Sequence, residues 1–191
     1  MIRADFTNTL IHLTRDKAEQ SAADTFHKIV EEKSLNGSTE NIRGKSKCIC
    51  FSETPISAIG QIVSQNHQGF RYGAFGFMFS KKYLFNKGAR PVIYQPDTDF
   101  SILPESLQYR HVRFEIDKVD WTWEREWRMK IDLLLLEPEH VTLIVPNREI
   151  VEQFKTKNSS HNLGLSIALP GVPVHRKLEW HFITLEDLGY N

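Results

Sequence analysis

Eight residues near position 125 combine three indole rings with two carboxylates. The segment is Trp121-Thr122-Trp123-Glu124-Arg125-Glu126-Trp127-Arg128. On a strand, Glu124 and Glu126 would point to the same face, about 7 Å apart. In aromatic surroundings the pKa of one carboxyl can rise while the other stays ionised. Such a pair can move a proton and can stabilise an oxocarbenium-like transition state on a sugar.

A structural interpretation of the same segment is open as well. The glutamates would then pair at the surface with Arg125, Arg128 or Lys130, and the tryptophans would supply the buried face of a strand. Both interpretations place this segment on one strand.

Side chains from other parts of the chain could bind a small ligand. His12 ends an apolar run, Ser52 follows another, and Tyr94 lies beside prolines. Taken singly, each has a structural alternative: a hydrogen-bonded histidine, a helix cap and a core tyrosine. Arg71 could bind a phosphate and Tyr72 a planar ring, or the two could form a polar turn. The histidines lack metal-ligand spacing such as HxxxH, so we predict no metal site.

A second acidic cluster allows a nuclease hypothesis. It consists of Glu115, Asp117 and Asp120, with Lys118 between them. The spacing is strand-like, but a solvated strand end is the favoured interpretation of this cluster.

Short apolar runs separated by turn signals predict the elements that position these residues. Strands are predicted at 9–13, 48–51, 73–79, 91–94, 123–136 (one long strand or a bent pair), 141–145, 167–169 and 180–183. Helices are predicted at 17–33 with Thr14 or Asp16 as the cap, from Pro55 to about 64, and after Asn147. The uneven interleaving favours one α+β domain, residues 1–191, with a mostly antiparallel sheet and flanking helices.

Composition narrows the function classes. The 191 residues carry 24 Lys+Arg and 24 Asp+Glu, so the uniform phosphate attraction of a nucleic-acid coat protein is missing. No run approaches the ~20 apolar residues of a membrane span. Cys48 and Cys50 are too close for an ordinary disulfide and are expected in the core. GxGxxG and Walker loops are absent. We expect a cytoplasmic protein.

Five short motifs in consistent order resemble the AbiGi-type abortive phage-resistance family. They are His12-Leu-Thr, Cys50-Phe-Ser-Glu-Thr-Pro-Ile56, Tyr72-Gly-Ala-Phe-Gly-Phe-Met-Phe-Ser80, Pro91-Val-Ile-Tyr94 and Glu124-Arg-Glu-Trp-Arg128. This resemblance covers residues 10 to 130. It implies phage defence but no particular reaction, and the family has also been described with an antitoxin label.

A weaker resemblance is to the ADP-ribosyltransferase fold, in particular to its DarT-like DNA-modifying branch. It is carried by the His-x-Thr strand, the aromatic strand with Pro-x-x-Tyr after it, and the Glu126-Trp-Arg-Met-Lys strand followed by Val141 to Pro146. Glu124-x-Glu126 also resembles the paired-glutamate motif of arginine-modifying members. The fold implied is a twisted, split sheet. The branch's catalytic arginine has no convincing counterpart, and Arg71 and Arg43 are candidates only.

The second resemblance implies NAD as the substrate and assigns roles around it. His12 and Thr14 would hold the ribose hydroxyls or the carboxamide, and Ser52 would contact the same ligand. An aromatic side chain would stack on the cationic nicotinamide; the candidates are Tyr72, Phe79 and Tyr94. Glu126 would stabilise the oxocarbenium-like transition state, and Glu124 would orient or deprotonate the acceptor.

Two functional hypotheses follow. The chain is a toxin-like phage-defence effector that transfers ADP-ribose from NAD to a nucleic-acid or protein acceptor, restrained by a cognate partner protein. Alternatively, it is a non-catalytic antitoxin or sensor module of an abortive-infection system.

Overall fold

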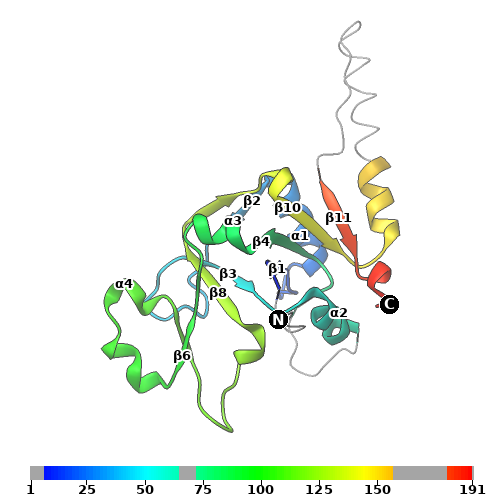
Figure 1. Ribbon diagram of the computed structural model, residues 1–191. Helices are drawn as coiled ribbons and strands as arrows, with labels where there is room; N and C mark the ends of the chain where they lie inside the picture. Colours follow the sequence, from blue (N-terminus) through cyan, green and yellow to red (C-terminus); the bar gives the residue numbers. More distant parts are fainter. Residues whose placement is uncertain (1–6, 65–71, 157–179, 191) are drawn as a thin grey trace, which may run out of the picture.

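A seven-stranded sheet forms the centre of the protein (Figure 1). The computed structural model describes residues 7–64, 72–156 and 180–190. The strand order is β11-β10-β4-β1-β3-β8-β5, and only the pair β10–β11 is parallel. The bounds are β1 (Thr9–Leu13), β3 (Cys48–Ser52), β4 (Gly76–Ser80), β5 (Arg90–Pro91), β8 (Glu126–Lys130), β10 (Val141–Val145) and β11 (His181–Thr184). The predicted α+β class with a mostly antiparallel sheet is confirmed.

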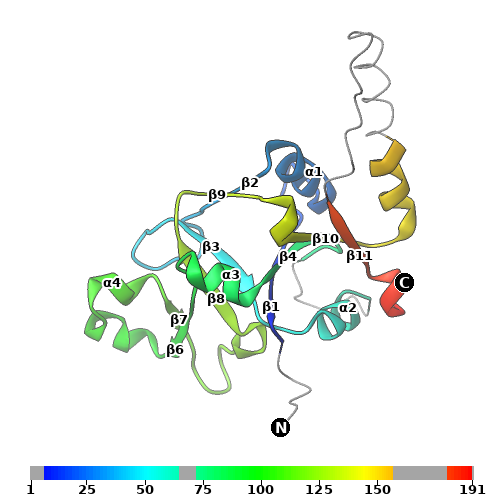
Figure 2. The ribbon, with the colours of Figure 1, turned by 45° about the horizontal axis from the view of Figure 1, so that its top comes forward.

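Pairing within this sheet is uneven around β1, which lies between β4 and β3 in both views (Figures 1 and 2). Strand β1 pairs with β4 at five positions, from Thr9↔Ser80 to Leu13↔Gly76. Strand β3 likewise pairs with β8 along its whole length. Between β1 and β3 the register contains one position, Ile11↔Ser52. The β11-β10-β4-β1 part and the β3-β8-β5 part of the sheet are therefore joined at one paired position, and we call this short junction the division of the sheet.

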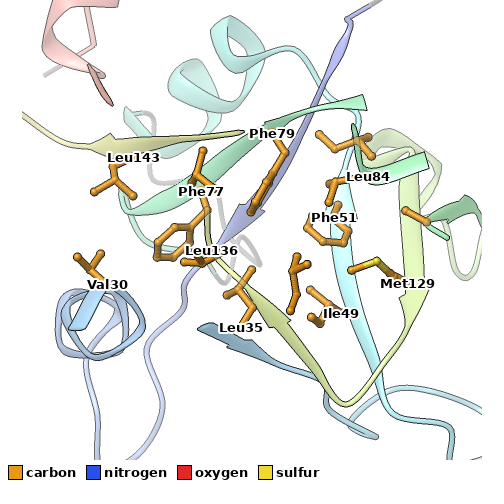
Figure 3. Packing of buried hydrophobic residues seen from close by; sticks show 14 of the residues in the cluster. Val30, Leu35, Ile49, Phe51, Phe77, Phe79, Leu84, Met129, Leu136 and Leu143 are labelled. Atoms are coloured by element: carbon orange, nitrogen blue, oxygen red, sulfur yellow. The ribbon is translucent and has the colours of Figure 1, made fainter. Parts of the chain in front are cut away.

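Apolar side chains cover both faces of the sheet. Helix α1 (Ala22–Glu32) packs Phe26 and Val30 onto one face, in the cluster with Leu10, Phe77 and Phe79. Helix α2 (Ile56–Ser64) packs Ile59 onto the opposite face against Ile11. Figure 3 shows Phe77, Phe79 and Phe51 in the larger cluster, and the rings of Phe79 and Phe51 are in edge contact. The period-2 pattern of 73–79 correctly predicts that Phe77 and Phe79 are buried, each worth about 2 kcal/mol. The strand itself begins only at Gly76, and Phe75 before it is partly buried.

The start of α1 differs from the prediction. Residues 17–33 were expected to be helical with Thr14 or Asp16 as the cap, but Ser21 caps α1 in a capping box with Asp24. Lys17 and Gln20 instead form a bridged turn. Asp16 accepts a hydrogen bond from the Ala22 amide, 2.7 Å, and so fixes the turn before the helix. The local capping box overrides the earlier polar residues.

Further short elements join the sheet strands. They are β2 (Ser34–Asn36), α3 (Lys81–Asn86), β6 (Ile93–Gln95), η1 (Asp97–Ile102), α4 (Glu105–Gln108), β7 (His111–Arg113), η2 (Thr122–Glu124), β9 (Leu133–Leu135), η3 (Pro138–His140), a helix at 148–156 and η4 (Glu186–Leu188). Strand β2 pairs with β9, and β6 pairs with β7. We call residues 90–113 the insert.

Several predicted strands change in detail. The strand expected at 91–94 is divided between β5 and β6, and 123–136 becomes η2, β8 and β9. The strands expected at 9–13, 48–51 and 141–145 are present, and Asn147 Oδ1 caps the following helix by accepting from the Ile150 amide, 3.2 Å. The strand expected at 167–169 lies outside the described residues.

Within the described ranges, every helix is too short or too polar to cross a membrane.

Candidate functional site

A cavity of about 700 Å³ lies beside the single paired position of β1 and β3, and both paired residues, Ile11 and Ser52, line it. One wall comes from the end of β1 and includes His12, Thr14 and Arg15. The other wall comes from β3, from residue 72 and from the 121–128 segment. It includes Ser52, Tyr72, Glu124, Glu126 and Arg128. Four of the expected ligand-binding residues from distant parts of the sequence therefore line one space: His12, Thr14, Ser52 and Tyr72.

The cavity reaches both faces of the sheet. His12 lies opposite Phe77 in the β1–β4 register, so its side chain is on the face covered by α1. Ser52 lies opposite Ile11 and Glu126, so both Ser52 and Glu126 are on the other face. Residues from the two faces of the sheet can line one cavity because β1 and β3 are paired at only one position.

His12 spans this division with its ring. Its Nδ1 lies 2.8 Å from the Cys50 carbonyl oxygen on β3. A carbonyl can only accept, so Nδ1 carries the hydrogen and Nε2 of the neutral ring is an acceptor. Burial lowers the pKa of His12, more than the hydrogen bond to Cys50 raises it. The imidazole is therefore neutral at pH 7 and fixed in one tautomer.

Glu124 does not lie on the strand predicted for it. It ends the 3₁₀ turn η2, and Arg125 then adopts a left-handed conformation with φ 45° before β8 begins. The predicted same-face geometry of Glu124 and Glu126 on a continuous strand is therefore wrong. The Ser52 hydroxyl donates to the Glu124 carbonyl, 2.6 Å, and thereby ties η2 to the end of β3.

The carboxyl of Glu124 has an unusual environment. The Tyr72 hydroxyl donates to Oε1 at 3.4 Å. Burial and the neighbouring charge of Glu126 raise the pKa of Glu124 to about 7, although Tyr72 and Arg128 oppose the rise. At neutral pH this carboxyl exists in both protonation states, as suits a group that takes up and releases a proton.

Glu126 has the opposite environment. Arg128 Nε and Nη2 donate to its two carboxylate oxygens at 2.7 and 3.2 Å. The side chains of Arg128 and Glu126 are only 5% and 11% exposed. Pairing with Arg128 was the structural alternative from the sequence, but the pair is buried at the cavity and not at the surface. The two glutamates thus differ in their partners: Glu126 forms an ion pair with Arg128, whereas Glu124 accepts from the Tyr72 hydroxyl.

The other expected site residues occupy different places. Tyr94 is not among the residues that line the cavity; its hydroxyl accepts from the Glu126 amide, 2.9 Å, and donates to the Trp121 carbonyl, 3.3 Å. Tyr94 therefore orients the backbone of Glu126 from outside. Thr14 lines the cavity but donates its hydroxyl to the Phe75 carbonyl, 3.2 Å. Arg71 lies outside the described residues.

Among the residues named for stacking or for an arginine role, two have other environments. Phe79 is 1% exposed in the core and away from the cavity, so it is wrong as a stacking candidate. Tyr72 remains at the cavity wall. Arg43 lines the cavity but pairs with Asp97, 2.5 Å, and lies over the Phe100 ring at 4.3 Å.

The two cysteines differ from each other. Both line the cavity, but Cys48 is buried as predicted, whereas Cys50, also expected in the core, is only half-buried. Burial and the charge of Glu126 raise the pKa of the Cys50 thiol well above its usual value. The thiol is therefore protonated at neutral pH and is a poor nucleophile.

The second acidic cluster lies at the surface. Glu115 binds Arg113 at 2.8 Å, and Asp120 accepts from the Thr122 amide, also at 2.8 Å. In the part of the chain that the structure describes, no group of three or more His, Cys, Asp or Glu residues could hold a metal ion. The geometry gives the nuclease hypothesis no support.

Sequence reasoning did not identify the buried role of Arg128, nor Arg15 as part of the wall. A signal for Arg128 was present, because residues two apart on a strand share a face and Glu126 precedes it by two.

Comparison with known proteins finds no matching family model, no matching curated protein and no matching solved structure.

Proposed function

We propose that this protein transfers ADP-ribose from NAD to an acceptor within the cavity between β1 and β3. One observation carries the proposal: the divided sheet brings His12 and the Glu124–Glu126 pair, more than a hundred positions apart, onto the walls of one cavity. The same division supports an ADP-ribosyltransferase-like fold.

Binding would use the neutral imidazole. Because Nδ1–H is held by the Cys50 carbonyl, Nε2 can accept a hydrogen bond from a ribose hydroxyl. The Tyr72 ring at the opposite wall would stack on the cationic nicotinamide. Ser52 and Thr14 use their hydroxyl hydrogens within the protein, so they could contact the ligand only as acceptors.

The chemistry would divide between the two carboxyls. The bond between ribose C1′ and the nicotinamide nitrogen breaks, its electron pair leaves with nicotinamide, and positive charge develops on the ribose. The Glu126 carboxylate, in its ion pair with Arg128, would stabilise that charge. Glu124, with a pKa of about 7, would accept the proton that the acceptor loses as it bonds to C1′.

The biological setting is part of the proposal. The resemblance to the AbiGi-type family supports a toxin-like role in phage defence, in the cytoplasm, with a nucleic-acid or protein acceptor and a cognate partner protein that restrains the activity. Expression in cells tests this role: the wild-type chain should slow growth, and Glu126→Gln should not.

Nicotinamide release from NAD by the purified protein, in the presence of cell lysate as a source of acceptor, tests the reaction. The wild type should release nicotinamide and label a lysate component. Glu126→Gln and Glu124→Gln should each lower the rate at least about 100-fold. Glu139→Gln, an exposed glutamate away from the cavity, is the matched control and should retain full activity.

Absence of release and of label with the wild type, together with unchanged growth inhibition by Glu126→Gln, would overturn the transferase proposal. A stable complex with a partner protein under those conditions would instead favour the antitoxin or sensor hypothesis.

A further inference from the structure

Arg128 is held at the cavity by hydrogen bonds on both sides of its guanidinium group. Its guanidinium binds both oxygens of Glu126 on one side. On the other side Nη1 donates to the carbonyl oxygens of Tyr109 and His111, each at 2.9 Å. Four hydrogen bonds thus fix the plane of a guanidinium group that is almost fully buried.

The two carbonyls come from the insert. Tyr109 directly follows α4, and His111, which itself lines the cavity, begins β7. The insert also supplies Tyr94, whose hydroxyl accepts the Glu126 amide hydrogen. Both the side chain and the backbone of Glu126 are therefore oriented through the insert.

We propose that Arg128 is a positioning residue, which holds the Glu126 carboxylate in its reactive orientation by tying it to the insert backbone at Tyr109 and His111. The catalytic part of this inference rests on the proposed function, because it needs the transfer reaction. The geometric part, the hydrogen bonds that hold Glu126, does not depend on that reaction. A planar fork is needed because one cation must reach two carboxylate oxygens and two carbonyls together.

A lysine cannot replace this arrangement. Its ammonium is a single point at the end of a shorter arm, so it reaches either Glu126 or the two carbonyls. The Glu126 carboxylate would then be free to rotate, and its charge would be less well neutralised. Because Glu126 raises the pKa of Glu124 and Arg128 lowers it, Glu124 should respond to the change.

The experiment compares wild type with Arg128→Lys, with Arg128→Gln and with the control Arg110→Lys. Arg110 is an insert arginine that binds the Pro91 carbonyl, 2.8 Å, away from the cavity. Thermal unfolding establishes the folded fraction of each variant, and all rates are expressed per folded molecule. Nicotinamide release gives kcat and KM, and carboxyl NMR follows the Glu124 titration.

With Arg128→Lys, kcat should fall about 100-fold while KM for NAD changes less than about threefold, because Arg128 orients a reacting group without binding substrate. The Glu124 midpoint should rise from about 7 in the order wild type, Arg128→Lys, Arg128→Gln, by about one unit in the last. Arg110→Lys should match the wild type in both measurements.

Unchanged kcat per folded molecule, or an unchanged Glu124 midpoint in both Arg128 variants, would overturn the positioning role. If one variant fails to fold, the other decides. If the wild type releases no nicotinamide, the proposed function fails by itself. The Glu124 titration then still tests whether Arg128 controls the carboxyl pair.

Discussion

Two buried ion pairs lie on opposite faces of β8. Glu126 and Arg128 line the cavity, with side chains 11% and 5% exposed. Glu53 binds Lys81 and accepts from the Trp127 indole, 2.7 Å, on the other face, with side chains 16% and 15% exposed for the ion pair. Neither Glu53 nor Lys81 is part of the cavity wall. Similar burial and geometry thus serve two purposes, and access to the cavity distinguishes them.

The largest loss of stability should come from removing one partner of the Glu126–Arg128 pair. Glu126→Ala leaves the Arg128 guanidinium buried without its carboxylate, and we expect a loss of about 3 to 5 kcal/mol in the free energy of unfolding. Urea unfolding monitored by tryptophan fluorescence measures it. Nicotinamide release should be lost in the molecules that remain folded. A loss below 1 kcal/mol would show that water reaches Arg128.

Removing one partner of the Glu53–Lys81 pair should lower the free energy of unfolding by less and leave the activity unchanged. Glu53→Ala removes the partner of Lys81 and of the Trp127 indole, but the lysine ammonium can move toward solvent. We expect a loss of about 2 kcal/mol by the same urea experiment. Nicotinamide release per folded molecule should equal that of the wild type. Equal loss of activity in both variants would remove the distinction between the two pairs.

A smaller, pH-dependent effect is expected at Glu124. Its folded pKa of about 7 exceeds the ordinary 4.5, so the folded state binds more protons between these values. The free energy of unfolding of the wild type should therefore fall as the pH rises from 4.5 to 7. Glu124→Gln lacks this loss and should become the more stable protein above pH 7. Parallel stability curves for the two proteins would contradict the raised pKa.

The smallest effect is expected at His12, on the β1 wall. His12→Leu removes the hydrogen bond to the Cys50 carbonyl, and we expect a loss of about 1 kcal/mol at pH 7. The wild type should lose stability as the pH falls below 6.5, because the unfolded chain then binds a proton that the folded ring resists. His12→Leu should show a weaker acid dependence. An equal acid dependence would assign it to another group.

Local pattern was enough to predict much of the sheet. The alternation of small and aromatic residues defined β4, and short apolar runs defined β1, β3 and β10. The turn at Glu124 was missed because a left-handed arginine at position 125 has no sequence signal such as glycine. Ser21 was missed as the α1 cap because Thr14 and Asp16 offered competing signals.

The division of the sheet could not be derived from local pattern. It depends on which strands pair and over how many positions, and those contacts join segments about forty residues apart. The hydrogen bonds of Arg128 could not be derived from local pattern either, since two of its acceptors are backbone carbonyls of another segment, at Tyr109 and His111. The sequence did supply the residue types that line the cavity, because unusual clusters such as the indole-flanked glutamates are visible without coordinates.

The most direct test of the account is a crystal structure of the Glu126→Gln variant with NAD. In this variant cleavage is slowed, and the glutamine side chain has nearly the same shape as the glutamate that Arg128 binds. We predict that the nicotinamide ribose lies between the His12 imidazole and the side chains at positions 124 and 126, with Tyr72 against the nicotinamide ring. An empty cavity at saturating NAD, or NAD bound on another surface, would contradict the account.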